Sequence, residues 1–225
     1  MEDEGSRVNT FESDGVRIAY IDEGAGDPVL LLHGFASSIR YNWTDPGWVR
    51  TLTGAGYRVI AYDARGHGAS EKLYAPEDYG AEKMYGDARR LLDHLGIARA
   101  DVMGYSMGAR LTAFLAIRHP DRVRSAIFGG LGDVKNPTAR TFRAFAEQTH
   151  SDLKALAVCI RAARVVISAE MLATITCPVL VAVGTEDVIG GSAEELAGRI
   201  PGARALNIQR RDHIRAVGDR AYKEG

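Results

Sequence analysis

The sequence predicts a doubly wound α/β fold with helices on both faces of the sheet. Short, nearly continuous apolar runs are typical of strands buried on both faces of a parallel sheet, and five occur here: "PVLLL", "YRVIAY", "ADVMGY", "RSAIFGG" and "CPVLVAVG". Helical stretches separate several of these runs, which predicts βαβ units. The 225 residues are 46% hydrophobic and 25% charged, which is ordinary globular composition with enough apolar material for one core.

The first predicted element is an antiparallel hairpin over residues 8–24. Its two strands join at Asp14-Gly15, a dipeptide that accepts the positive φ of a tight turn. The later strands are predicted at 28–32, 57–62, 100–105, 124–130, 177–184 and 203–208, and helices at 47–56, 81–96 and 107–120. In the helix over 81–96, apolar residues recur at helical spacing and Gly96 is the expected C-cap.

One region interrupts the alternation of strands and helices. Residues 131–176 carry helical patterns at 137–148 and 151–164 and no strand signal. The connection is long for a compact domain, and long connections are often lids or binding elements. We expect a single domain, residues 1–225, in which residues 131–176 form a small helical cap.

Charge and composition exclude several classes of partner. The chain has 28 Lys and Arg against 29 Asp and Glu, so no strong field attracts nucleic acid or an anionic membrane. No apolar run approaches the roughly 20 residues of a membrane-spanning helix, and the acidic N-terminus lacks the features of a secretory signal. We expect a soluble, cytoplasmic protein that binds a small molecule. Cys159 and Cys177 have no paired spacing, which favours buried free thiols over a disulfide or zinc site.

The candidate nucleophile is Ser106, in the sequence Gly104-Tyr105-Ser106-Met107-Gly108. This Gly-x-Ser-x-Gly pattern falls between a predicted strand and a predicted helix, which is the context of a nucleophile elbow. The tight turn exposes the hydroxyl, and glycines on both sides let strand and helix pack closely. The alternative is a glycine-serine turn without chemical significance.

A serine nucleophile needs a base and a group that orients the base. Asp187 follows one late strand and His213 follows the next, which gives the chain order serine, acid, histidine. We assign His213 as the base and Asp187 as the acid. Asp133, one strand earlier, stays open as an alternative acid, and we expect Asp212 to be a solvated loop charge.

Two backbone N–H groups are candidates for an oxyanion hole. The N–H of Met107 lies at the predicted start of a helix, and that of Phe35 lies in the loop "HGF" after the third strand. His33 in this loop is a base or metal ligand, or an anchor that holds the loop by hydrogen bonds, which we favour. Tyr41, Trp43, Trp48 and Met107 either line a substrate pocket or are packing residues.

Residues 27–118 resemble the α/β-hydrolase fold superfamily. The resemblance rests on "HGF" from His33, "YDARGHGAS" at 62–70 and "GYSMGA" from Gly104, and the later "VGTEDVIGG" and "RRDHIRAVGD" resemble the acid and histidine loops of that family. It implies a mostly parallel eight-stranded sheet with an antiparallel second strand. It also implies a serine hydrolase that acts on carboxylic esters and needs no cofactor.

The resemblance carries further implications about chemistry. Asp63, Arg65 and His67 are structural in such proteins, and the epoxide-hydrolase and haloalkane-dehalogenase branches use aspartate where this chain has Ser106. Peroxide-dependent acyl transfer and hydrolytic carbon–carbon cleavage use the same triad and stay open. So does a binding protein that retains the triad but turns over slowly, because a fold is not a function.

The chain departs from the family in its cap and in its C-terminal stretch. The short cap predicts an open site for small to medium acyl groups. The residues after His213, 214–225, suffice for about three helical turns, where the family has a long helix. We expect a second subunit to cover the apolar surface left there, which makes the protein a homo-oligomer.

Overall fold

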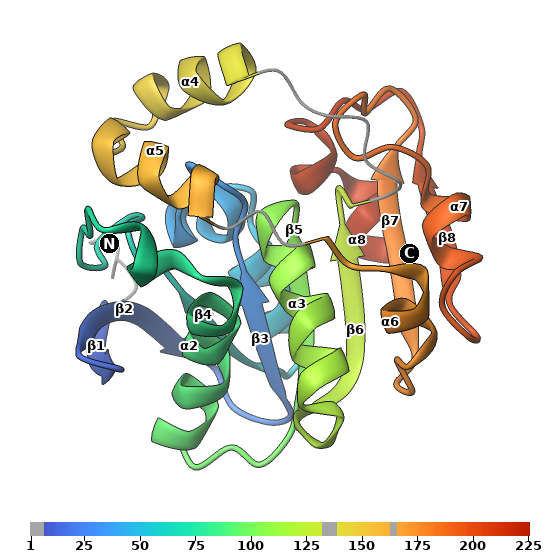
Figure 1. Cartoon of the computed structure of the whole chain (residues 1–225). Helices are drawn as coiled ribbons and strands as arrows, with labels where there is room; N and C mark the ends of the chain where they lie inside the picture. Colours follow the sequence, from blue (N-terminus) through green and yellow to red (C-terminus); the bar gives the residue numbers. More distant parts are fainter. Residues whose placement is uncertain (1–6, 132–138, 163–165) are drawn as a thin grey trace, which may run out of the picture.

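The computed structural model describes residues 7–131, 139–162 and 166–225, and it confirms the predicted α/β architecture (Figure 1). The described strands form an eight-stranded sheet in the order β1-β2-β4-β3-β5-β6-β7-β8. β2 runs antiparallel to both of its neighbours and the other pairings are parallel, which confirms the antiparallel second strand. The strands are β1 (Asn9–Ser13), β2 (Val16–Glu23), β3 (Pro28–Leu32), β4 (Arg58–Tyr62), β5 (Ala100–Tyr105), β6 (Val123–Gly129), β7 (Val179–Gly184) and β8 (Arg204–Ile208).

The central strands are largely apolar because both of their faces are buried. In β3, Leu30 and Leu32 belong to the core on one face of the sheet, whereas Val29 and Leu31 belong to the core on the other. Successive side chains of a strand point to opposite faces, so an uninterrupted apolar run supplies two cores at once.

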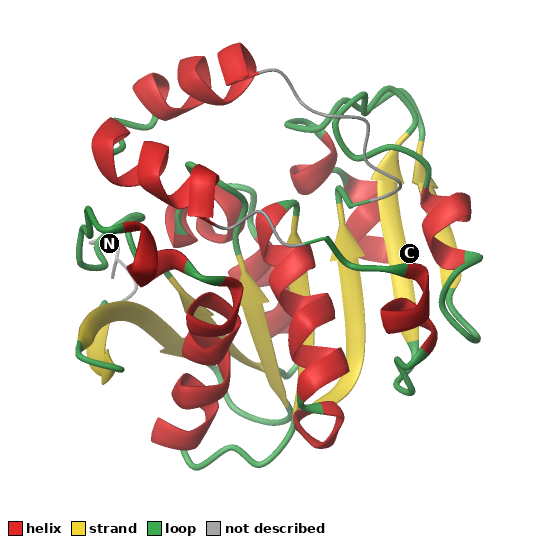
Figure 2. Ribbon diagram, in the orientation of Figure 1, coloured by secondary structure: helices red, strands yellow, loops and turns green. Residues whose placement is uncertain are grey.

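Helices cover both faces of the sheet, as predicted (Figure 2). The larger core packs against α2 (Ala81–His94), α3 (Met107–Arg118), α6 (Ala169–Ala173) and α7 (Ala193–Ala197). The core on the opposite face packs against α1 (Trp48–Gly54), α8 (Arg220–Glu224) and a π-helical turn, η1 (Arg40–Thr44), that the sequence did not predict. The described residues also form three short 3-10 turns, η2 (Pro76–Tyr79), η3 (Pro120–Arg122) and η4 (Ala216–Gly218).

The aromatic residues near η1 belong to the core. Trp43 and Trp48 are buried, and their rings meet edge to face with centroids 6.4 Å apart. Tyr222 of α8 packs edge-on against Trp48 at 5.0 Å. Trp43 and Trp48 were left open as pocket-lining or packing residues, and in the structure they are packing residues. The residues after His213 form η4 and the short α8 rather than one continuous helix.

The segment predicted as a cap contains α4 (Ala139–Gln148), α5 (Leu153–Ala162) and α6. Figure 1 shows α4 and α5 beyond the carboxyl ends of the central strands, while α6 lies beside α3. Residues 132–138 and 163–165 of this segment lie outside the described residues, and its treatment as one cap insertion stays a prediction. None of the helices in the described ranges is long and apolar enough to cross a bilayer.

The two cysteines are buried free thiols, as predicted. Burial raises the pKa of Cys159 to about 12 and also raises that of Cys177. Because the thiolate is the reactive form of cysteine, neither side chain is a competing nucleophile at neutral pH.

Candidate active site

Ser106 lies at the junction of β5 and α3, directly after the last residue of the strand and before the first of the helix. Its backbone is at φ +54° and ψ −109°, in a region that residues with a side chain rarely adopt. The N–H of Ser106 donates to the carbonyl of Gly129 at the end of β6, 2.7 Å away. The strained turn is thus fixed to the neighbouring strand.

The two glycines of the motif are required by the packing around this turn. A Cβ at Gly104 would overlap the carbonyl group of Gly108, and a Cβ at Gly108 would overlap the carbonyl oxygen of Leu32 in β3. These obstacles are backbone atoms, which cannot move as the end of a flexible side chain can. The structure therefore confirms the close packing inferred from the two glycines: α3 lies directly against β3 and β5.

Asp187 and His213 are brought together from loops that follow β7 and β8. Nδ1 of His213 lies 2.7 Å from Oδ2 of Asp187. The carboxylate is fully buried and the imidazole is 12% exposed. A carboxylate is an acceptor, so this contact places a proton on Nδ1 and leaves Nε2 unprotonated in the neutral ring.

The backbone that follows Asp187 holds the carboxylate in place. The N–H groups of Ile189 and Gly190 both donate to Oδ1, at 2.9 and 2.6 Å, which leaves Oδ2 for the histidine. A Cβ at Gly190 would lie 2.6 Å from Oδ2, so there is no room for a side chain at this position. Glu186, the adjacent carboxylate, is exposed.

His213 packs against the residue that precedes the nucleophile. The hydroxyl of Tyr105 donates to the carbonyl of His213 at 2.6 Å, and the two rings are 5.4 Å apart at their centroids. The imidazole therefore lies at the same end of the sheet as Ser106. Among the described residues the Ser106 hydroxyl makes no hydrogen bond; such contacts in active sites often tighten only when substrate binds.

The other acidic candidates differ in position. Asp133, the alternative acid, lies outside the described residues. Asp212 accepts hydrogen bonds from the N–H groups of Ile214 and Arg215, at 3.0 and 2.8 Å. It is a carboxylate that organises the loop after His213, near solvent.

The two predicted oxyanion donors belong to segments that lie next to Ser106. Met107 is the first residue of α3. The loop with Phe35 lies close to the nucleophile, because a Cβ at Gly34 would be 3.5 Å from Cβ of Ser106. Asn42 of η1 accepts a hydrogen bond from the N–H of Gly34 at 2.9 Å. This asparagine could not be selected from the sequence, since η1 itself was not predicted.

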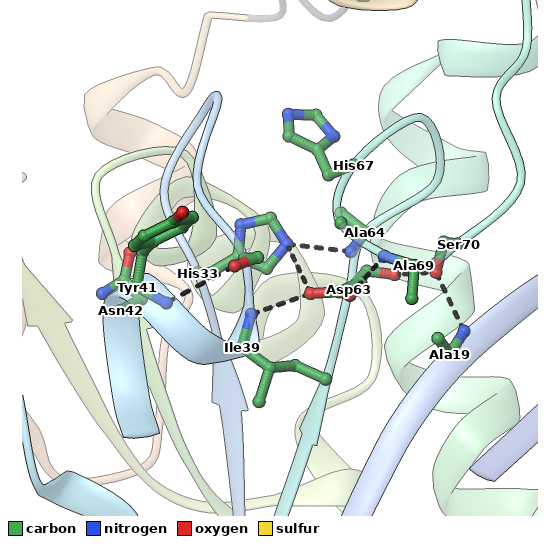
Figure 3. A network of polar contacts seen from close by, with 12 residues as sticks. Ala19, His33, Ile39, Tyr41, Asn42, Asp63, Ala64, His67, Ala69 and Ser70 are labelled. Atoms are coloured by element: carbon green, nitrogen blue, oxygen red, sulfur yellow. Dashed lines mark hydrogen bonds and ion pairs between the residues drawn. The ribbon is translucent and has the colours of Figure 1, made fainter. Parts of the chain in front are cut away.

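His33 anchors the loop that carries Phe35, as favoured from the sequence. One ring nitrogen, Nδ1, donates to the carbonyl of Gly34 at 2.7 Å, and the other, Nε2, accepts from the N–H of Ala64 at 2.9 Å. The carboxylate of Asp63 lies 4.0 Å from the same nitrogen, Nε2 of His33. It accepts hydrogen bonds from the N–H groups of Ile39 and Ala69 (Figure 3). Burial lowers the pKa of His33, so the ring stays neutral and serves as a structural link.

The remaining charged residues of the turn after β4 are also structural. The guanidinium of Arg65 makes two hydrogen bonds to the carboxylate of Asp87, at 2.8 and 2.7 Å, in a fully buried pair. Burial, together with the nearby His33, lowers the pKa of His67 to about 3. These contacts bear out the roles that the family resemblance implied. Within the described residues, no three His, Cys, Asp or Glu side chains form a cluster suited to a metal ion.

Comparison with known proteins yields a family match that includes the elbow. A model of the alpha/beta hydrolase fold matches residues 27–155, more than half of the chain. Epoxide hydrolase 3 from Siraitia grosvenorii is 33% identical over 118 residues, which are 52% of this chain and 36% of that protein. Epoxide hydrolase B from Mycobacterium tuberculosis is 38% identical over 117 residues, 50% of this chain and 32% of that protein. The matched part spans about a third of the length of these curated relatives.

A solved structure extends the likeness to nearly the whole chain. The enol-lactonase from Burkholderia xenovorans LB400 superposes with a TM-score of 0.78 at 25% sequence identity, over 92% of this chain and 93% of that chain. The likeness therefore extends beyond the family match over residues 27–155.

Proposed function

The chain belongs to the alpha/beta hydrolase fold family, and we propose that it is a serine hydrolase of small to medium carboxylic esters. One observation carries the proposal. Ser106 occupies a strained turn at the end of β5, and the hydrogen-bonded pair of Asp187 and His213 packs against the preceding residue, Tyr105. Strain at a polar residue persists where the surrounding structure holds it for a function.

The proposed reaction proceeds through an acyl-enzyme. Nε2 of His213 takes the proton of Ser106 as the hydroxyl oxygen attacks the ester carbonyl, and Asp187 stabilises the imidazolium that forms. The N–H groups of Phe35 and Met107 donate to the tetrahedral oxyanion. The imidazolium then protonates the leaving alcohol. Water, activated by the same histidine, hydrolyses the acyl-serine and restores the enzyme.

The choice of nucleophile favours esters over epoxides. A carboxylate that opens an epoxide forms an ester on the enzyme, and water can hydrolyse that ester. A serine that opened an epoxide would form an ether, which offers no carbonyl for water to attack, so the enzyme would be blocked after one event. Because Ser106 stands at the elbow, turnover requires an acyl substrate.

The likeness to an enol-lactonase supports the same class of substrate. A lactone is a cyclic ester, and its hydrolysis needs the same nucleophile, base and oxyanion donors as that of an open ester. The similarity covers 92% of this chain. Lactones therefore belong among the esters tested.

A chromogenic assay tests the proposal. We expect steady release of nitrophenol from p-nitrophenyl acetate or butyrate, and loss of that release in Ser106→Ala, with the folded state of the variant checked by circular dichroism. A panel of chain lengths and lactones would define the acyl group accepted. Turnover that survives Ser106→Ala would exclude the serine mechanism. Ester binding without turnover by the wild type would instead favour the binding-protein alternative.

A further inference from the structure

The loop that presents Phe35 is held by side chains on both sides of that residue. On one side, the N–H of Gly34 donates to the buried Asn42 at 2.9 Å. On the other, the carbonyl of Ala36 accepts from the hydroxyl of Thr149 at 2.9 Å. Ala36 has φ +59°, a left-handed conformation that is unfavourable for a residue with a Cβ. The loop therefore depends on external contacts to keep this shape.

Thr149 belongs to the α4–α5 turn (residues 149–152), which is 113 residues away from Ala36 in the chain. Its hydroxyl oxygen also lies 2.9 Å from that of Ser151, which in turn is 3.4 Å from the Ala36 carbonyl. When Ser151 donates to Thr149 and Thr149 donates to Ala36, the two bonds polarise and strengthen each other. Thr149 is the nearer of the two hydroxyls to the loop.

The Thr149 hydroxyl also lies 3.2 Å from the Ala146 carbonyl of α4, which is a longer contact than the 2.9 Å to the Ala36 carbonyl. The apolar contact between the loop and the α4–α5 region is a small cluster of Phe35, Ala36, Phe145, Ala146 and Leu156. Beside it lies a cavity of about 100 Å³, lined by polar groups that include Ser37, Ser38 and Thr149. The turn is thus separated from part of the loop by open space, and the hydroxyl bridges the two.

We infer that Thr149 is a positioning residue of the oxyanion hole: its hydroxyl fixes the Ala36 carbonyl and thereby the direction of the Phe35 N–H. The inference rests on the proposed function, because it assigns the Phe35 N–H to the oxyanion. Loss of the bond removes a restraint on the strained Ala36 and lets the loop relax. The ester carbonyl of bound substrate carries little charge, so the defect appears mainly in the transition state.

A set of variants at Thr149 tests the inference. Thr149→Val keeps the shape of the side chain and removes the hydroxyl. We expect kcat to fall about 10-fold with KM within about 2-fold, since small displacements of catalytic groups cost up to about 100-fold and one lost oxyanion donor costs about 100-fold to 1,000-fold. Thr149→Ser should restore most of kcat. Thr149→Val combined with Ser151→Ala should fall further, because Ser151 can take over part of the contact.

Tyr74→Phe is the matched control. The hydroxyl of Tyr74 donates to Asp152 in the same turn at 2.8 Å, and within the described residues it makes no hydrogen bond to the loop that carries Phe35. We expect kcat of Tyr74→Phe to stay within about 2-fold of the wild type, since a partly exposed hydrogen bond contributes little. A fall equal to that of Thr149→Val would show that loosening the turn, not loss of the Ala36 contact, is responsible, and would overturn the inference.

Binding of a trifluoromethyl ketone supplies a readout that a merely structural role would not move. Ser106 adds to its carbonyl and forms a tetrahedral oxyanion, so its affinity should fall by the same factor as kcat/KM in Thr149→Val while the midpoint of thermal unfolding changes little. Wild-type kcat or wild-type affinity for the ketone in Thr149→Val would overturn the inference. Neither outcome touches the proposed function, which stands or falls with Ser106→Ala.

Discussion

Ser106 and the pair of Asp187 and His213 lie at the same end of the sheet but are held in place by different means. The turn at Ser106 is confined by backbone atoms that leave no space for a Cβ at Gly104 or Gly108. The pair depends on hydrogen bonds in two loops, from the Ile189 and Gly190 N–H groups to the carboxylate and from Tyr105 to the histidine backbone. Steric confinement fixes Ser106, whereas directional polar contacts orient His213.

The difference predicts that the elbow is a determinant of folding and the pair a determinant of activity. A substitution in the elbow must displace a strand or helix that belongs to the core. A substitution beside the pair can be absorbed by a loop, at the cost of the geometry of the base. Three variants or conditions test this contrast, beginning with the largest expected effect.

Gly108→Ala should destabilise the whole fold. Its Cβ would overlap the Leu32 carbonyl, so α3 must move away from β3. We expect a loss of at least about 3 kcal/mol in the free energy of unfolding, the upper part of the range for overpacking a core, as measured by urea denaturation. Gly54→Ala is the control, because nothing lies within 4 Å of a Cβ there, and in a helix this change is neutral or stabilising. Similar stability in both variants would refute steric confinement at the elbow.

Gly190→Ala should reduce activity far more than stability. Its Cβ would lie 2.6 Å from Oδ2 of Asp187 and would push the carboxylate away from His213. We expect kcat/KM to fall about 100-fold, the loss that follows from a displacement of about 1 Å, while the protein remains folded. The measurement is ester hydrolysis beside thermal unfolding. A large fall in the midpoint of thermal unfolding beside the fall in kcat/KM would contradict the distinction between the two regions.

Acid should weaken the support behind the loop that carries Phe35. His67 is buried and its folded-state pKa is lowered to about 3, mainly by burial, from an ordinary value of 6.5. The folded protein therefore binds no proton there above about pH 4, whereas the unfolded chain does below pH 6.5. Stability is fully present above pH 6.5 and is lost as the pH falls, by up to about 1.4 kcal/mol per pH unit from this group.

Urea unfolding at several pH values between 7 and 5 measures this dependence before the carboxylates titrate. The buried imidazole of His33, whose pKa is also lowered, adds to the slope. His67→Gln should reduce the slope, because glutamine does not titrate. An unchanged slope in that variant would show that the pH dependence arises elsewhere.

Local constraints explain why the elbow could be predicted from the sequence. Gly104, Ser106 and Gly108 are close together in the chain, and the strand and helix on either side are visible as periodic patterns. The eight strands and the antiparallel second strand followed from the family resemblance. Asp187 and His213 could be selected because each follows a predicted strand, and parallel strands end at one edge of the sheet.

Contacts between distant segments explain what the sequence did not reveal. Asn42 lies in a π-helical turn that has no clear periodic signature, and its partner is a backbone N–H. Thr149 contacts Ala36, which is 113 residues away in the chain, and a threonine at the end of a helix carries no sequence signal of such a partner. A glycine is required at position 190 because the Asp187 carboxylate occupies the space of a Cβ there. Such roles follow from three-dimensional packing, which residue type and spacing do not encode locally.

Covalent labelling tests most directly whether Ser106 is the nucleophile and His213 its base. The protein would be treated with a fluorophosphonate and analysed by intact mass and peptide mapping. We expect one phosphonyl group per chain, located on Ser106, and a labelling rate that collapses in His213→Ala. A label on another residue, or wild-type labelling in His213→Ala, would contradict the catalytic assignment.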